Sequence, residues 1–217
     1  MKKSIYLSWG KRILDLALTA PAVIVLSPLL ALVAVLVRIR LGSPVLFKQI
    51  RPGLHEKPFE IFKFRTMTDA RNQDGKLLSD AQRITRLGAF LRKTSLDELP
   101  ELFNVLNGDM SLVGPRPLLM QYLPYYTRRE RLRHTVRPGL TGLAQVSGRN
   151  LLKWDERLEA DVKYVESASP ALDARIIFQT VMQVLKSKDV VVVPGTVGSL
   201  LNQYRKHWNV KDRHDSM

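Results

Sequence analysis

The chain opens with a long apolar segment. Residues 16–37 carry no charge, and as one helix they would be about 33 Å long, close to the roughly 30 Å hydrocarbon core of a bilayer. Ser27-Pro28 falls at the midpoint, where proline removes a backbone donor and predicts a bend, and the Ser27 hydroxyl can bind a freed carbonyl. Basic residues flank both ends, and such residues prefer the cytoplasmic face. This pattern favours a re-entrant helix-break-helix over a single spanning helix.

The rest of the chain has the pattern of a compact domain. Alternation predicts strands at 45–50 and 59–65, turn residues bracket a further strand at 144–146, and helical spacing predicts helices at 82–93, 96–106, 154–164 and 172–185. The fold class is therefore α+β and mainly α-helical. We divide the chain into a membrane anchor (1–42), a folded domain (43–190) and a basic tail (191–217) that we expect to be loosely held from Asn202. Asp15, at the basic entry to the apolar segment, is expected to pair with Lys11 or Arg12.

Composition limits the classes of function. A hydrophobic content of 45% excludes a wholly disordered chain, and a net charge of +14 indicates an anionic partner: nucleic acid, anionic lipid or a phosphorylated small molecule. The chain has no cysteine and only four scattered histidines, which argues against disulfides and against a thiolate or histidine metal site. Residues 122–136, with tyrosines followed by arginines, fit a membrane interface, a solvated helix face or a nucleic-acid surface.

Three short stretches carry candidate chemistry. Ser95 and Glu98 have the spacing of a capping box, and acidic residues in a first helical turn complement the helix dipole. The same dipole would keep Asp97 ionised and attract an incoming phosphate. Arg116 lies between two prolines, which suits either a preorganised phosphate ligand or a surface turn. Lys63, among aromatic residues, either buries only its stem or binds an anion at the site.

Together these motifs resemble those of the bacterial sugar transferases, the small monotopic phosphoglycosyl transferases. The resemblance covers residues from about Gly10 to Ser187. It lies in the Ser-Pro-broken apolar segment followed in order by the motifs at 62–67 (FKFRTM), 95–100 (SLDELP), 107–117 (NGDMSLVGPRP) and 137–142 (RPGLTG). It implies an enzyme of the bacterial inner membrane that is monotopic, with a compact cytoplasmic catalytic domain and amphipathic interface helices. Its partners would be a UDP-sugar, polyprenyl (undecaprenyl) phosphate and anionic inner-membrane lipid.

The family's reaction moves a sugar-1-phosphate from the UDP-sugar to the polyprenyl phosphate and releases UMP, as the first membrane step of glycoconjugate and exopolysaccharide assembly. The resemblance makes Asp97 the nucleophile that forms an aspartyl phospho-sugar and Glu98 the ligand of Mg²⁺. It makes Arg116, Lys63, Arg149, Asp161 and Tyr164 substrate contacts, and Ser27-Pro28 the re-entrant break.

A basic membrane-anchored scaffold or nucleic-acid-binding protein is the alternative hypothesis, and it predicts nucleic-acid binding that weakens steeply with salt. The chain has no recognised nucleic-acid motif, and its most patterned stretch is acidic. We therefore expect no nucleic-acid partner.

Overall fold

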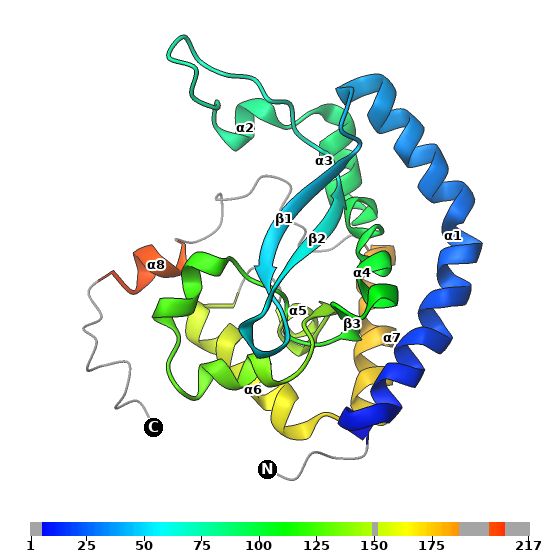
Figure 1. The fold of residues 1–217 in the computed structure, drawn as a ribbon, viewed down its shortest axis with the longest axis vertical. Coiled ribbons are helices and arrows are strands. Elements are labelled where there is room, and N and C mark those ends of the chain that lie inside the picture. Colours follow the sequence, from blue (N-terminus) through cyan, green and yellow to red (C-terminus); the bar gives the residue numbers. More distant parts are fainter. Residues whose placement is uncertain (1–5, 149–151, 187–199, 207–217) are drawn as a thin grey trace.

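The apolar segment forms one helix along the side of the molecule. In the computed structural model, which describes residues 6–148, 152–186 and 200–206, α1 runs from Lys11 to Leu41 and bows around the other elements (Figure 1). Pro28 leaves the Ile24 carbonyl without its helical donor. The Ser27 hydroxyl donates to that carbonyl at 2.8 Å, as the sequence predicted. The helix curves without interruption at Ser27-Pro28, so it differs from the expected pair of separate helices.

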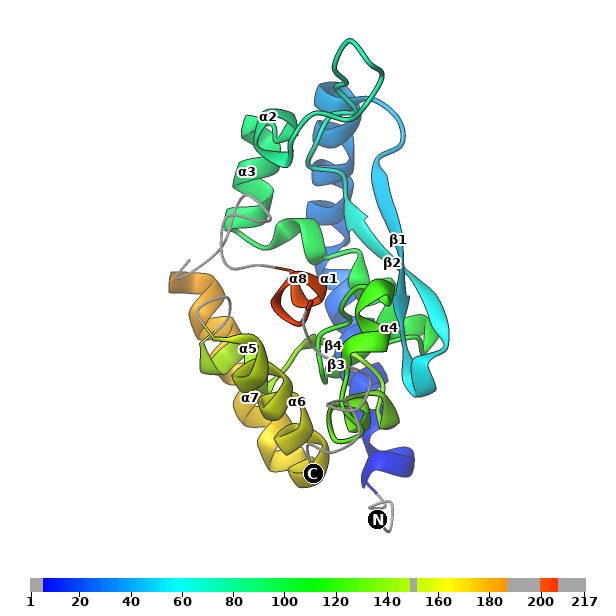
Figure 2. The ribbon, with the colours of Figure 1, turned by 90° about the vertical axis from the view of Figure 1, so that its left-hand side faces the viewer.

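The remaining elements form two small sheets covered by short helices. After the π-helical turn Tyr6–Gly10 and α1, the order is β1 (Leu46–Pro52), the 3₁₀ turn Leu54–Glu56, β2 (Pro58–Phe64), α2 (Asp80–Arg83), α3 (Arg86–Lys93), the 3₁₀ turn Leu96–Glu98, α4 (Glu101–Asn107), β3 (Ser111–Val113), the 3₁₀ turns Met120–Tyr125 and Glu130–Thr135, β4 (Gly139–Thr141), α5 (Leu143–Ser147), α6 (Trp154–Ser167), α7 (Pro170–Lys186) and α8 (Leu201–Tyr204). Figure 2 shows α5, α6 and α7 together on one side of the molecule and the β1–β2 hairpin on the other. The predicted α+β class, mainly helical, is confirmed.

The first turns of α1 are fixed by polar contacts. Asp15 accepts hydrogen bonds from the Ser111 hydroxyl at 2.9 Å and from the next backbone amide at 3.0 Å. Lys11 forms a buried ion pair with Asp173 of α7, and Arg12 donates to two carbonyls at the end of α4. Asp15 thus takes its hydrogen bonds from β3 rather than from Lys11 or Arg12, and of the predicted pairing the electrostatic attraction to Lys11 remains.

The second half of α1 joins the core on one face only. Val33 and Val37 are buried against Phe64 of β2 and Leu91 of α3. The opposite face leaves large apolar side chains in the open, including Val25 at 75% exposure. The helix is long and apolar enough to cross a membrane, and this exposed face is one that lipid would cover.

The two predicted strands at 45–65 are confirmed as an antiparallel hairpin. Its register places Phe47 opposite Lys63 and Ile50 opposite Glu60. The second sheet pairs β3 and β4 in parallel, and it depends on glycine because the two backbones approach closely: a Cβ on Gly139 would lie 2.0 Å from the Gly114 nitrogen. The strand predicted at 144–146 was wrong, since those residues lie in α5.

Tertiary contacts also divide the helix predicted at 82–93. Ile84 leaves the helix to bridge Met67, and Thr85 caps α3 by accepting from the Gly88 amide at 2.9 Å. A Cβ on Gly88 would lie 1.9 Å from the Thr66 carbonyl oxygen, so this glycine lets α3 pack against the strand exit. The helices predicted at 154–164 and 172–185 are confirmed as parts of α6 and α7.

The stretch at 122–136 is not one amphipathic helix but two 3₁₀ turns joined by a short link. Its leading tyrosines, Tyr122 and Tyr126, are buried, and Arg129, Arg131 and Arg133 all bind acidic side chains of the same chain. The two tyrosines and Arg133 therefore serve internal packing, whereas Arg129 and Arg131 form ion pairs at the surface.

Candidate active site

Asp97 and Glu98 lie in the 3₁₀ turn that links α3 to α4. Ser95, just before that turn, has a left-handed backbone with φ of 59°, and its side chain makes no cap hydrogen bond. The predicted capping box was wrong, because Glu98 binds two cations rather than the Ser95 backbone. Pro100 is the N-cap of α4, two residues after this turn. The left-handed turn and the proline thus bring two adjacent acids into the interior, with Asp97 only 8% exposed.

Glu98 is the centre of an ion cluster. One of its carboxylate oxygens accepts from the Lys63 ammonium at 2.6 Å and also binds Arg116. The other carboxylate oxygen lies 3.3 Å from a second Arg116 nitrogen, so the guanidinium binds in a forked manner. Lys63 also lies 3.1 Å from Glu101 of α4, whose side chain is 1% exposed. The structure therefore brings together four of the residues expected at the site and adds Glu101.

The environment separates the acidities of the three carboxyl groups. Burial and then the adjacent Glu98 raise the pKa of Asp97, although Lys63, Arg92 and Arg116 oppose the shift. Burial would also raise the pKa of Glu98, but Arg116 and Lys63 outweigh it and hold that pKa well below its usual range. Burial raises the pKa of Glu101 to about 7 against the charge of Lys63. Glu98 is thus the firmly ionised member of the group.

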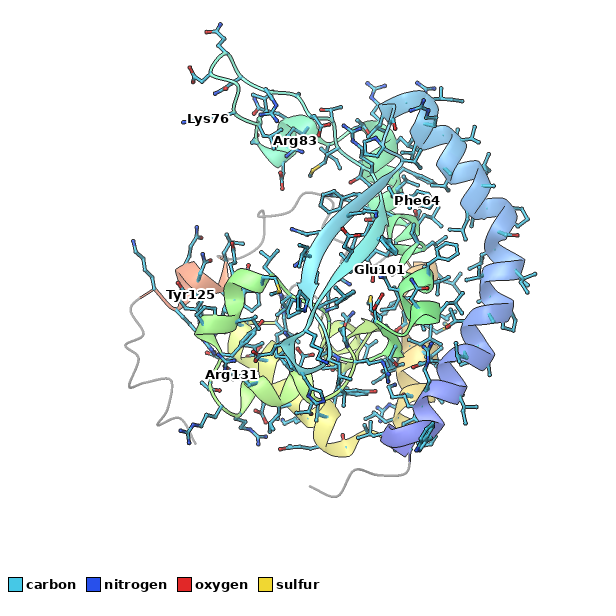
Figure 3. The ribbon with its side chains drawn as sticks, viewed as in Figure 1. Phe64, Lys76, Arg83, Glu101, Tyr125 and Arg131 are labelled. Atoms are coloured by element: carbon cyan, nitrogen blue, oxygen red, sulfur yellow. The ribbon has the colours of Figure 1, made fainter. Side chains whose placement is uncertain are left out.

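Lys63 reaches the cluster because Asn104 ties α4 to β2. The Asn104 amide donates to the Glu60 carbonyl at 2.7 Å and accepts from the Phe62 backbone nitrogen at 3.0 Å. Asn104 is fully buried, so a polar clamp replaces a further strand at this edge of the hairpin. Figure 3 shows Glu101 in the interior beside β2. The spacing of three between Glu98 and Glu101 is the sequence signal that would have identified the extra acid.

Hydrogen bonds fix the backbone at Arg116. The Gly139 amide donates to the Pro115 carbonyl at 3.0 Å, and the Arg133 guanidinium donates to the Arg116 carbonyl at 2.7 Å. Arg133 in turn forms a fully buried ion pair with Asp161 at 2.8 Å. The Arg116 side chain remains 40% exposed, which leaves it accessible to a ligand while its backbone is fixed.

The structure places the remaining expected residues elsewhere. Asp161 is 2% exposed and contacts Arg133. Tyr164 is 1% exposed, and its hydroxyl donates to an Asp173 carboxylate oxygen at 2.8 Å. Asp173 is the residue that also binds Lys11 at the start of α1. Arg149 lies outside the described residues. Ser27-Pro28 belongs to the middle of α1 and has no part in the ion cluster.

Arg51, at the end of β1, adds positive charge near the site and had not been expected there. Burial and the charge of Arg116 lower the pKa of Arg51 to about 10. Its Nε atom is buried without a hydrogen-bond partner in the described part of the chain. Two guanidinium groups that repel each other favour an anion between them.

The donor set fits Mg²⁺ bound together with a phosphorylated ligand. Among the described residues, no three Asp, Glu, His or Cys side chains are grouped to hold a metal alone. Mg²⁺ usually takes one or two protein carboxylates and completes its octahedron with water and phosphate oxygens. The carboxylate oxygens of Asp97 and Glu98 are ligands of that kind, and the neighbouring cations suit the phosphate.

Comparisons with known proteins show the family of the chain. The model of the family described as bacterial sugar transferase matches residues 6–187. The uncharacterized sugar transferase EpsL of Bacillus subtilis (strain 168) is 51% identical over 180 residues, which cover 83% of this chain and 89% of EpsL.

Two other relatives have a more specific description, UDP-glucose:undecaprenyl-phosphate glucose-1-phosphate transferase. The one from Klebsiella pneumoniae is 42% identical over 183 residues, which cover 80% of this chain but only 39% of that protein. The one from Caulobacter vibrioides (strain ATCC 19089 / CIP 103742 / CB 15) is 42% identical over 187 residues, which cover 81% of this chain and 69% of the relative. The chain therefore belongs to the bacterial sugar transferase family.

Proposed function

We propose that the protein transfers a sugar-1-phosphate from a UDP-sugar to undecaprenyl phosphate and releases UMP. The observation that carries this proposal is the buried Asp97 beside the cluster of Glu98, Lys63 and Arg116. A carboxylate within reach of two phosphate-binding cations has the composition of a phosphoryl-transfer site, where positioning and charge neutralisation supply most of the catalysis.

The reaction proceeds through two displacements at one phosphorus atom. In the first, an Asp97 oxygen attacks the phosphorus that bears the sugar, the bond to the bridging oxygen breaks, and UMP leaves with that electron pair. In the second, an oxygen of undecaprenyl phosphate attacks the same phosphorus and the Asp97 carboxylate is released. Arg116 and Lys63 hold the phosphate oxygens and offset the repulsion between anions.

Glu98, with the substrate phosphates, would hold Mg²⁺, which when bound polarises the phosphoryl group and neutralises charge on the leaving phosphate. Arg116 is the side chain that keeps the phosphoryl group aligned with Asp97. We propose UDP-glucose as the donor because the relatives from Klebsiella and Caulobacter are described as acting on it.

We also propose that α1 enters the cytoplasmic leaflet of the bacterial inner membrane and returns to the same side. Asp15, near the start of α1, binds β3, and Val37, near its end, packs on β2 and α3. Both ends therefore contact one folded body, and this supports the proposal that they lie on the same side of the membrane. The exposed apolar middle of the bowed helix (Figure 1) fits lipid. In this arrangement the site would lie at the headgroups, where a lipid phosphate arrives.

The test of the reaction is UMP release. The purified protein, incubated with UDP-glucose, Mg²⁺ and undecaprenyl phosphate, should release UMP and form the lipid-linked product. Asp97→Asn should abolish both while leaving the fold intact, and Asp74→Asn, at an exposed turn, should retain activity. Normal turnover by Asp97→Asn would exclude Asp97 as the nucleophile.

The covalent intermediate and the membrane arrangement have separate tests. Labelled donor without lipid acceptor should leave a label on the wild-type protein that hydroxylamine removes, and no label on Asp97→Asn. Cysteines introduced at positions 3 and 45 should react with an impermeant reagent from the same side of sealed vesicles. Reaction from opposite sides would show a spanning helix.

A further inference from the structure

The C-terminal segment beyond the family match packs back onto the folded body. The match ends at residue 187, yet Leu201 is fully buried with Tyr122, Tyr126 and Leu158. The Arg205 side chain is 1% exposed. The expectation that the chain is loosely held from Asn202 was therefore wrong for residues up to Lys206, because one apolar and one cationic side chain fix α8 to the body.

Arg205 binds four acceptors from three elements. One guanidinium nitrogen donates to the Tyr125 carbonyl at 2.8 Å and to Glu130 at 2.7 Å. The second donates to the other Glu130 oxygen at 2.7 Å and to Asp155 of α6 at 2.5 Å. The planar guanidinium can donate to all four of these acceptor atoms, whereas the single ammonium group of a lysine could not. Arg205 thus fixes the link between the two 3₁₀ turns to the start of α6.

The link between the two 3₁₀ turns is connected to the backbone of Arg116 through Tyr126 and Arg133. Tyr126 directly follows Tyr125 in the sequence, and its hydroxyl accepts a hydrogen bond from an Arg133 guanidinium nitrogen at 3.2 Å. The Arg133 guanidinium donates to the Arg116 carbonyl at 2.7 Å. Tyr126 and Arg133 are both buried, at 2% exposure each. A set of buried and part-buried contacts therefore joins the C-terminal segment to the loop that presents the candidate phosphate ligand.

We infer that Arg205 is a positioning residue, and that residues 200–206 act as a brace within the same chain that sets the place of Arg116. This inference rests on the proposed function for the role of Arg116. It adds a part of the chain that lies outside the matched family region. Small displacements of a positioning group reduce catalysis strongly, so the brace affects turnover without touching substrate.

The test compares Arg205→Ala and Arg205→Lys with Lys206→Ala, which removes an exposed neighbouring charge. Arg205→Ala should lower kcat/KM for the UDP-sugar by about tenfold to a hundredfold, Arg205→Lys should lower it less, and Lys206→Ala should leave it unchanged. In a protein that already carries Arg116→Ala, adding Arg205→Ala should cause little further loss, because coupled residues are non-additive. Equal and additive losses would overturn the inference, since they show an effect that does not pass through Arg116.

Hydrogen exchange provides a readout that does not depend on activity. Amides of residues 116–134 should exchange faster in Arg205→Ala than in Lys206→Ala. If the alanine variant does not fold, Arg205→Lys takes its place in this comparison. Faster exchange confined to residues 200–206 would refute the brace even if the wild-type protein is active. If the wild-type protein releases no UMP, while the Arg205 variant still shows faster exchange across residues 116–134, the proposed function is rejected and the brace is retained.

Discussion

Replacing Asp161 by Asn separates a structural role from a substrate-binding role. The family resemblance made Asp161 a substrate contact, whereas the structure pairs it with Arg133 in the interior, where the two side chains are 2% and 1% exposed. Asn keeps the shape of Asp but removes its charge. Arg133 would then remain buried without its counter-ion.

The expected cost follows from that geometry. Removing one partner of a buried ion pair typically costs about 3–5 kcal/mol. Burial raises the pKa of Asp161 even though Arg133 opposes the shift, and one Asp161 oxygen has no hydrogen-bond partner among the residues that the structure describes. The pair is therefore not ideal, and we expect the lower end, about 3 kcal/mol. This is a large part of the 5–15 kcal/mol that stabilises a typical domain.

Guanidinium unfolding in detergent, followed by tryptophan fluorescence, measures this change. Glu159→Gln is the matched control, because Glu159 lies on the same helix α6 but pairs with Arg129 at the surface, where both side chains are 41% exposed; little change is expected there. Asp161→Asn with wild-type stability and a raised KM for the UDP-sugar would refute the structural role and restore the substrate contact.

Three further changes test other parts of the molecule. Burial and neighbouring arginines lower the pKa of His134 from 6.5 to about 3. Between about pH 6.5 and 3, His134 is therefore protonated in the unfolded chain and neutral in the folded one. Stability should fall as the pH drops below about 6.5, by up to about 1.4 kcal/mol per pH unit, and His134→Asn should flatten that slope in unfolding curves. Gly139→Ala should lower the Tm sharply, since its Cβ would lie 2.0 Å from the Gly114 nitrogen. Gly75→Ala has open space around it and only the cost of a left-handed backbone at φ +75°, about 1–2 kcal/mol. Chelating Mg²⁺ should stop UMP release and adding it back should restore the release, whereas undiminished release in chelator would reject the metal role of Glu98.

Local pattern predicted much of the fold. The strand alternation at 45–65 and the helical spacing at 154–185 depend on the residues themselves, and both were right. The end of the helix predicted at 96–106 was right to within one residue, since α4 ends at Asn107 and Gly108 takes the left-handed backbone that follows. The errors lie where distant backbones meet. The close approach of Gly139 to Gly114 decides that β4 forms and α5 follows, and nothing in the spacing of residues 139–147 reveals that approach.

The same division holds for the site. Asp97, Glu98, Arg116 and Lys63 stood out because the family motifs contain them, and the structure brings their side chains together. Glu101 was missed because an acid in a helix that also carries core leucines reads as a surface position, whereas α4 buries it against β2. Whether Asp161 and Tyr164 point inward depends on how α6 packs, which motif spacing does not encode.

Under the proposed function, substrate binding at the cluster around Glu98 would be an exchange of ionic partners. In the structure, Glu98 occupies both cations that a phosphate would need, Lys63 at 2.6 Å and Arg116 through two nitrogens. A diphosphate brings more negative charge than one carboxylate and competes for the same donors. As the phosphate oxygens take Arg116 and Lys63, the Glu98 oxygens lose their cationic partners, and a divalent ion that arrives with the nucleotide would restore the balance. Glu98 would thus keep the cations in place before binding and become available as a metal ligand only when the phosphate is present, so that the charged site assembles around the substrate.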